Sequence, residues 1–192
     1  YNVAQEIYID MIPVTDYITS GVWQIILNPT RVVEGQYDLW LPSENVLNRG
    51  TGFLYPDEEV TLTIPSTADK VISVGAYDAL TFSYASFSGR GYTWQDERTK
   101  PDLVAPGVNV RTTAVGGGVT VVSGTSFATP FVTGASALLM EWGIVRGNDP
   151  FLYGEKVKAY LRRGARELPG FGKYPNREVG YGRLCLERSL PD

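Results

Sequence analysis

One short segment of the sequence has the residue types and spacing needed for nucleophilic chemistry. In the run from Ser123 to Gly134, a tight turn at Gly124 precedes Ser126, and apolar residues follow as far as Trp142. The Ala, Leu, Met and Phe content of that run predicts a helix from Ser126 to Trp142. Ser126 would then lie where free N–H groups and the positive end of the helix dipole favour an oxyanion. This position suits a nucleophile.

A serine at a helix N-terminus is most often a cap, and Ser126 considered without its neighbours would be interpreted as one. The neighbouring residues favour another role. Pro130 is expected in the first turn, where its missing N–H has no intrahelical partner to lose. Gly134 is expected to let another element pass close to the helix. Because the run is apolar nearly all round, it predicts a helix buried in a core.

The elements that position Ser126 are predicted to form an α/β fold. Residues 71–76 are a near-continuous apolar run, typical of a strand buried on both faces of a parallel sheet. Residues 108–123 predict a hairpin with Gly116-Gly117-Gly118 at its tip, since no Lys followed by Ser or Thr completes a phosphate loop. A second helix is expected from Asp149, as its cap, to near Arg163.

The first third of the chain has a different pattern. Alternating or β-rich runs lie at residues 6–9, 22–27, 36–41 and 60–64, with turn residues between them. We therefore expect a β-rich segment over residues 1–65 and an α/β segment over residues 66–192. Four aromatic side chains of the first segment could line a ligand site, although aromatic residues in strands more often pack: Trp23, Tyr37, Trp40 and Phe53.

Composition excludes several classes of function. The net charge is -4 and no basic run occurs, which argues against a nucleic-acid partner or an anionic membrane surface. The longest apolar stretch, residues 127–142, contains polar residues and is too short for a membrane span. Cys185 is the only cysteine, so no intrachain disulfide forms, and we interpret it as a small core residue.

Histidine is absent from the sequence. Since histidine is the side chain that most readily moves protons near neutral pH, the chain lacks the usual general base. The N-terminal Tyr1 is neither an initiator methionine nor the start of a signal-peptide pattern. We expect the chain to begin within a longer protein.

The run Gly-Thr-Ser-Phe-Ala-Thr-Pro-Phe-Val-Thr-Gly at residues 124–134 resembles the nucleophile signature of subtilisin-like (S8) serine peptidases. Other landmarks follow the family's order: the strand ending Val-Gly-Ala at residue 76, Asp-Leu-Val-Ala-Pro-Gly at 102–107, and Gly-Tyr-Gly at 180–182. The resemblance covers roughly residues 69–190. The β-rich segment before them is similar to the insert of clostridial Csp-type subtilases, which carry a jelly-roll domain there.

The resemblance implies that Ser126 is the catalytic nucleophile and that its backbone N–H is one donor of the oxyanion hole. The family's catalytic Asp, His and oxyanion Asn would lie upstream of this chain, so the chain alone is expected to be inactive. Asp102 is expected to be structural, because the family's catalytic Asp belongs to an earlier strand. The substrate would be a protein or peptide.

Partners, cofactors and location are also implied by the resemblance. The chain is expected to pair with the missing N-terminal half of the peptidase or to self-associate, since part of a sheet exposes apolar surface. No cofactor is expected, and calcium is possible although no site is identified. A secreted or spore-associated location is suggested.

Two alternatives are open. Sedolisins share a Gly-Thr-Ser turn but use acidic partners in place of histidine, which the absence of histidine makes worth considering; the downstream landmarks favour subtilases. The second alternative is a non-catalytic structural or protein-binding module, including a pseudoprotease.

Overall fold

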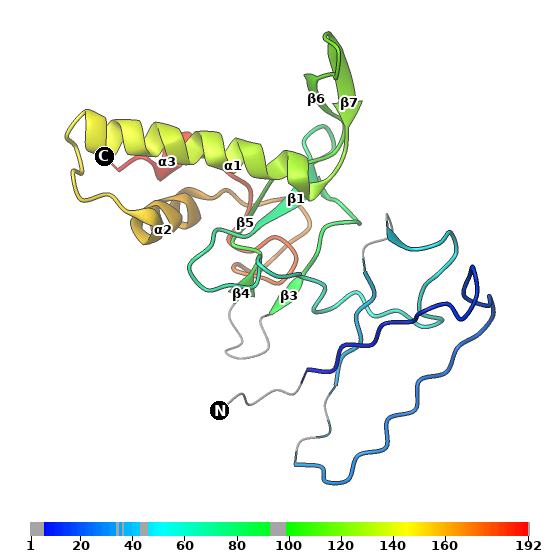
Figure 1. The fold of residues 1–192 in the computed structure, drawn as a ribbon. Helices are drawn as coiled ribbons and strands as arrows, with labels where there is room; N and C mark the ends of the chain where they lie inside the picture. The colour runs from blue at the N-terminus through cyan, green and yellow to red at the C-terminus, as the bar shows by residue number, and fades with distance from the viewer. Residues whose placement is uncertain (1–5, 34, 36, 43–45, 93–98, 192) are drawn as a thin grey trace. The chain divides into compact units, whose positions relative to one another are not determined.

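The computed structural model describes residues 6–33, 35, 37–42, 46–92 and 99–191. The chain divides into two compact units, Tyr1–Gly52 and Phe53–Asp192, which are described separately (Figure 1). The boundary lies before residues 65–69, where the sequence pattern changes. Backbone pairing explains the difference: the Thr61 N–H donates to the Arg90 carbonyl at 2.9 Å, and the Arg90 N–H donates to Thr61 Oγ1 at 3.0 Å. The segment that contains Thr61 is thus bound within the second unit.

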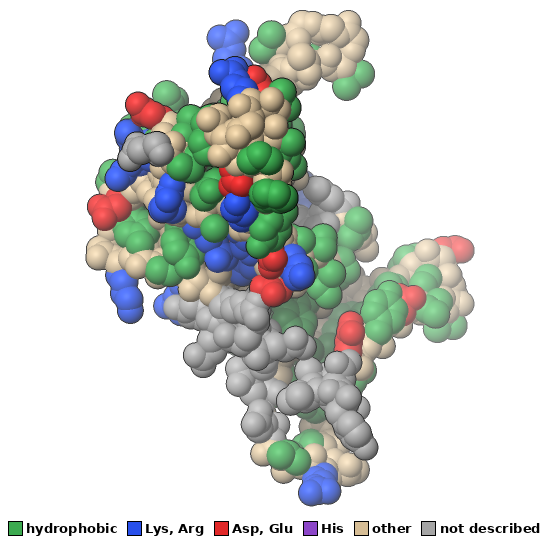
Figure 2. All heavy atoms as spheres, turned by 90° about the vertical axis from the view of Figure 1, so that its left-hand side faces the viewer, with side chains coloured by type: hydrophobic (Ala, Val, Ile, Leu, Met, Phe, Trp, Pro, Cys, Tyr) green, Lys and Arg blue, Asp and Glu red, His purple; other side chains and the backbone are tan. Residues whose placement is uncertain are grey.

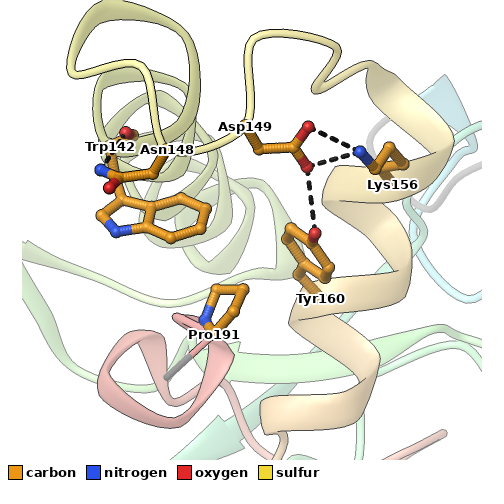
Figure 3. Close-up of a pocket in the computed structure, with 6 residues that line it drawn as sticks. All are labelled: Trp142, Asn148, Asp149, Lys156, Tyr160 and Pro191. Carbon is orange, nitrogen blue, oxygen red and sulfur yellow. Dashed lines mark hydrogen bonds and ion pairs between the residues drawn. The ribbon is translucent and has the colours of Figure 1, made fainter.

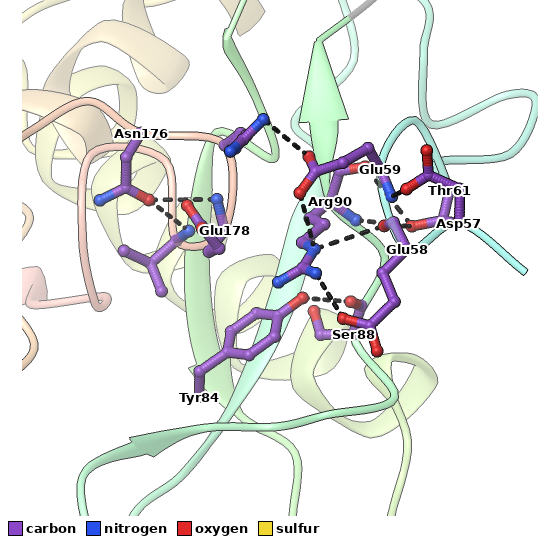
Figure 4. Close-up of polar contacts among 11 residues, drawn as sticks. Asp57, Glu58, Glu59, Thr61, Tyr84, Ser88, Arg90, Asn176 and Glu178 are labelled. Atoms are coloured by element: carbon purple, nitrogen blue, oxygen red, sulfur yellow. Dashed lines mark hydrogen bonds and ion pairs between the residues drawn. The ribbon is translucent and has the colours of Figure 1, made fainter. Parts of the chain in front are cut away.

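Charged side chains reinforce this attachment (Figure 4). The Glu59 carboxylate lies 3.5 Å from Arg90 Nε and 3.1 Å from Arg177 Nη1, and Arg90 also pairs with Glu58. Below these pairs, the Tyr84 hydroxyl donates to the Ser88 carbonyl. Ion pairs at partly exposed sites contribute little singly, but this network joins three segments that are far apart in sequence.

Strands are not found in the described part of the first unit. Most of its described residues have no regular secondary structure, so the strands expected at residues 6–9, 22–27 and 37–41 do not form there; Gln36 lies outside the described residues. Residues 60–64, in the second unit, also form no strand. A β-rich sequence becomes a strand only when its backbone pairs with a neighbour, and sequence pattern alone does not supply one. The jelly-roll arrangement therefore stays a prediction.

The second unit contains a small mixed sheet in the order β2-β1-β5. Strand β1 (Val74–Asp78) runs parallel to β5 (Leu103–Pro106) and antiparallel to β2 (Ser83–Tyr84). The predicted buried strand therefore begins later than residue 71. Two hairpins complete the strands: β3 (Gly91–Tyr92) with β4 (Thr99–Lys100), and β6 (Val110–Thr113) with β7 (Val119–Val122). The predicted hairpin within residues 108–123 is confirmed.

Helix α1 (Thr125–Met140) continues into a π-helical turn, η2 (Glu141–Val145). Helix α2 spans Gly154–Gly164, and a short α3 spans Leu186–Ser189. The predicted start of the second helix at Asp149 is wrong. The Leu152 N–H donates to the Asp149 carbonyl at 3.1 Å in a separate turn, and Tyr153 is the cap residue of α2.

The α/β class is confirmed, because α1 packs against the parallel pair β1 and β5. Small side chains meet at this interface, which brings the helix backbone close to the sheet. The core on the two sides contains Ala76, Leu103, Ala105, Ala128, Val132, Ala135 and Leu139. The prediction of burial all round is not met: Phe131 is 44% and Leu138 is 53% exposed in the structure.

The combined helix Thr125–Val145 is long and apolar enough to cross a membrane by length and composition alone. Core helices pass the same test, and α1 buries one face on β1 and β5. The exposed apolar side chains of α1, Phe131, Leu138 and Met140, are the feature that needs explanation.

A buried carboxylate holds three parts of the second unit together. Asp102 is 0% exposed, and its oxygens accept hydrogen bonds from the Ser73 N–H at 2.6 Å and the Lys100 ammonium at 2.8 Å. From α2, Arg162 Nε donates to the same carboxylate at 2.9 Å, and Lys158 Nζ lies 3.4 Å away. Asp102 thereby connects the segment before β1, the start of β5 and helix α2, which is a structural role.

We predict an unusual pH dependence from this cluster. Burial lowers the pKa of Lys158 to about 8, although attraction to Asp102 opposes the shift. In the unfolded chain the ammonium keeps its proton up to a pKa of about 10.4. Between these values the folded protein binds fewer protons, so Lys158 makes the free energy of unfolding rise with pH, by at most about 1.4 kcal/mol per pH unit.

The measurement is urea unfolding between about pH 7 and pH 10. The difference between the wild-type chain and Lys158→Met isolates this group, because the tyrosines titrate in both proteins. The expected result is that the wild type gains stability relative to Lys158→Met as pH rises above about 8. Parallel curves for the two proteins would contradict the prediction.

Candidate active site

Ser126 is the second residue of α1 and its side chain is exposed. The cap position belongs to Gly124, which makes no side-chain hydrogen bond, so Ser126 does not act as the helix cap. Within the described residues, no hydrogen bond involves the Ser126 side chain or its backbone N–H. The structure thus leaves a hydroxyl and an N–H donor available side by side at the positive end of the helix.

Close backbone contact fixes the turn before Ser126. Gly124 has φ +153°, a backbone conformation that residues other than glycine rarely adopt. Its N–H donates to the Gly107 carbonyl at 2.8 Å. A Cβ atom on Gly107 would lie only 2.6 Å from Ala76 Cβ and 3.0 Å from the Gly124 carbonyl oxygen. Glycine at position 107 therefore allows the turn to approach β1 directly.

A second contact ties the same turn to the loop after β5. The Asn109 N–H donates to Ser123 Oγ at 2.9 Å, and Asn109 has φ +52°, a conformation that asparagine tolerates better than most residues. The sequence singled out Ser123 and Gly107 within motifs, but it gave no sign that these residues meet. The contact depends on the β6–β7 hairpin, which brings residues 109 and 123 together.

The predictions for Pro130 and Gly134 are wrong. Because α1 begins at Thr125, Pro130 lies inside the helix, beyond the first turn, and it cannot donate to the Ser126 carbonyl four residues earlier. At Gly134, an added Cβ would meet nothing within 4 Å in the described structure. Among the described residues, therefore, no element passes close to the helix at Gly134.

The hairpin tip is confirmed as a turn. Gly116, Gly117 and Gly118 all have positive φ, and a Cβ on any of them would lie in open space. Within the described ranges, no group of three or more His, Cys, Asp or Glu side chains lies together as a metal site would require. Calcium binding stays a prediction from the resemblance.

The geometry supports part of a nucleophilic site. The structure brings together the Ser126 hydroxyl and its backbone N–H, and holds them with β1, the loop after β5 and α1; the oxyanion role of this N–H stays a prediction. Asp102 does not orient a base, because it is fully buried and already paired with cations. This chain contains no histidine, so it cannot supply a histidine as the general base.

Known proteins share this region. The sequence profile of the Subtilase family matches residues 54–182. Membrane-bound transcription factor site-1 protease of Mus musculus is 39% identical over 134 residues, which are 67% of this chain and 12% of that protein. Serine protease AprX of Bacillus subtilis (strain 168) is 34% identical over 156 residues, covering 71% of this chain and 33% of AprX. The chain thus spans a third or less of these relatives.

Among solved structures, the Clostridium perfringens CspB protease is similar to this chain with 50% identity and a TM-score of 0.71. The match covers 74% of this chain and 30% of CspB. This likeness confirms the resemblance to Csp-type subtilases. Since the family profile covers most of the chain, including Ser126 and the turn that holds it, the chain belongs to the Subtilase family.

Proposed function

We propose that Ser126 is the nucleophile of a subtilisin-like serine endopeptidase, and that this chain supplies the nucleophile, helix α1 and part of the sheet. The observation that carries the proposal is the exposed Ser126 hydroxyl at the start of α1, beside its own unpaired N–H. Membership of the subtilase family supports the reaction class, and a protein or peptide is the substrate.

In this mechanism Ser126 Oγ attacks the carbonyl carbon of the scissile peptide bond and forms an acyl-enzyme. The Ser126 N–H donates to the oxygen on which negative charge develops. A base must remove the hydroxyl proton, because an isolated serine is not appreciably ionised at neutral pH. We assign the histidine base, its aspartate and the oxyanion asparagine to other parts of the protease, so the chain alone is inactive.

The exposed face of α1 supports the same division. Exposed apolar side chains lie along α1, at Phe131, Leu138 and Met140, and continue along η2, at Ile144 and Val145, which is uncommon on the surface of a complete protein. We propose that the remainder of the peptidase domain covers this face. Self-association of the chain is the alternative way to bury it.

A second candidate is a non-catalytic member of the family, in which the parts outside this chain provide no histidine base and the subtilase fold acts as a structural or protein-binding module. This candidate keeps Ser126 in place but provides no base. The two candidates differ in the reactivity of Ser126.

A fluorophosphonate probe distinguishes them, because it modifies a serine only when a base activates it. The complete protease and the isolated chain would each be treated and analysed by peptide mass spectrometry. The proposal expects an adduct on Ser126 in the complete protease and none in the isolated chain. An adduct on Ser123 instead would exclude Ser126 as the nucleophile, and an unlabelled complete protein would favour the non-catalytic candidate.

A further inference from the structure

Two shallow hollows adjoin at the end of the second unit that contains η2, α2 and α3. The first has a volume of about 440 Å³ and is lined by Trp142, Asn148, Asp149, Lys156, Tyr160 and Pro191 (Figure 3). The second has a volume of about 660 Å³ and is lined by Arg163, Arg166, Glu187, Arg188, Leu190 and Pro191. Because Pro191 lines both, we treat them as one surface, called the α2 surface below.

The first hollow has aromatic walls and a neutralised ion pair. The rings of Trp142 and Tyr160 lie 6.5 Å apart at 77°, and Tyr160 comes from α2 while Trp142 comes from η2 (Figure 3). The Asp149 carboxylate accepts hydrogen bonds from the Tyr160 hydroxyl at 3.0 Å and from the Lys156 ammonium at 2.7 Å. These contacts hold the Tyr160 ring beside Trp142, so that both aromatic side chains line the hollow and offer apolar surface to a ligand.

Arginine side chains line much of the second hollow, and contacts with neighbouring residues hold the backbone that carries them in place. The Arg163 guanidinium lies 5.4 Å from the centre of the Tyr160 ring. The Arg166 backbone exchanges two hydrogen bonds with Arg183, at 2.9 and 2.7 Å. Arg188 precedes the fully buried Ser189, and no ion pair of Arg188 occurs within the described residues. Three arginines therefore line this hollow with a single carboxylate, that of Glu187, which lies 3.6 Å from Arg166 Nη2.

Charge decides the kind of ligand. The α2 surface carries four basic and two acidic side chains, although the whole chain has a net charge of -4. Lys and Arg side chains lie among hydrophobic ones on this face of the second unit (Figure 2). Guanidinium groups pair with carboxylates through two parallel hydrogen bonds, so arginine suits a ligand with acidic side chains.

We propose that the α2 surface binds an extended acidic peptide segment of a partner protein, in which acidic residues alternate with apolar ones. The acidic residues pair with Arg163 and Arg188, and an apolar residue packs between Trp142, Tyr160 and Pro191. The carboxylates of Asp149 and Glu187 interrupt the positive charge, which disfavours the continuous phosphate backbone of a nucleic acid. Both hollows are open, as an extended segment requires.

This surface is separate from the candidate active site. Residues 127–140 of α1 lie between Ser126 and the start of η2, a distance of about 22 Å at 1.5 Å per residue. Arg188 and Pro191 lie beyond residues 54–182, which match the family. The inference therefore does not depend on catalysis by Ser126.

The test measures fluorescence polarisation of a short fluorescein-labelled peptide in which glutamate alternates with leucine, titrated with the full chain. The double variant Arg163→Gln, Arg188→Gln is expected to weaken binding about tenfold or more. A matched control, Arg49→Gln with Arg111→Gln, removes two charges from exposed side chains that do not line the α2 surface. This control is expected to change affinity by less than about twofold.

A second arm changes the ligand and leaves the protein intact, so that folding of the variants does not affect the result. Replacing each glutamate of the peptide by glutamine is expected to abolish binding to the wild-type chain. The proposal is overturned if the acidic peptide fails to bind, if the control pair weakens binding as much as the test pair, or if single-stranded DNA of equal charge displaces the peptide more effectively than unlabelled peptide.

Discussion

Replacement of Ser126 by alanine is expected to lower kcat/KM of the complete protease by about 10⁴-fold or more. The substitution removes the oxygen that forms the covalent bond in the proposed mechanism, while the backbone N–H of residue 126 and the other proposed oxyanion donors remain. KM is expected to change little, because the hydroxyl contributes to the transition state and hardly to substrate binding. Hydrolysis of a chromogenic peptide substrate measures both constants.

Ser123→Ala is the matched control for this experiment. It removes a hydroxyl three residues away that accepts a hydrogen bond from the Asn109 N–H at 2.9 Å. Because the Gly124 N–H still donates to the Gly107 carbonyl, the turn keeps one of its two ties, and we expect a loss of about tenfold or less. Near-normal activity in Ser126→Ala would exclude this residue as the nucleophile.

Replacement of Asp102 by alanine is expected to lower the free energy of unfolding of the chain by about 3–5 kcal/mol. Asp102 is fully buried and is the carboxylate that Lys100, Lys158 and Arg162 approach. Without it, positive charges remain close together in a site that is shielded from water. The Ser73 N–H also loses its acceptor, which adds to the cost.

Urea unfolding of the chain measures the effect of Asp102→Ala, with Asp78→Ala as the control. Asp78 accepts a hydrogen bond from the Leu80 N–H at 2.8 Å in an exposed turn, so its loss is expected to cost about 1 kcal/mol or less. Asp102→Asn is expected to fall between the two, because the amide keeps one acceptor but no negative charge. Equal effects for Asp102→Ala and Asp78→Ala would contradict a structural role for the cluster.

Local pattern predicted the parts of the fold that neighbouring residues determine. The β6–β7 hairpin and the helix after Ser126 were predicted because turn glycines and apolar runs are contiguous in sequence. The start of α2 was predicted wrongly. The Asp-Pro pair at residues 149–150 is a common helix start, but α2 begins at Gly154. In the structure Asp149 binds Lys156 and Tyr160, contacts that no cap rule includes.

Ser126 could be identified from sequence for the same reason, since its turn and helix form one continuous segment. The residues that hold it could not. Gly107 is close to Ala76 and Gly124, and Asp102 is bound by Lys158 and Arg162, although long stretches of sequence separate these partners. Such contacts depend on how strands and helices assemble, and spacing along the chain does not reveal them.

The β6–β7 hairpin is closed at its base by the contacts of Gly124 with Gly107 and of Ser123 with Asn109. A Cβ atom added to any glycine of its three-glycine tip would meet nothing within 4 Å in the described structure. The length and composition of the segment between these two ends can therefore vary with little loss of stability. The entropic cost of closing a loop grows only slowly as the loop lengthens. Ser126, the proposed nucleophile, follows this hairpin directly in sequence. The hydrogen bonds at the base of the hairpin keep Ser126 in position when the hairpin varies.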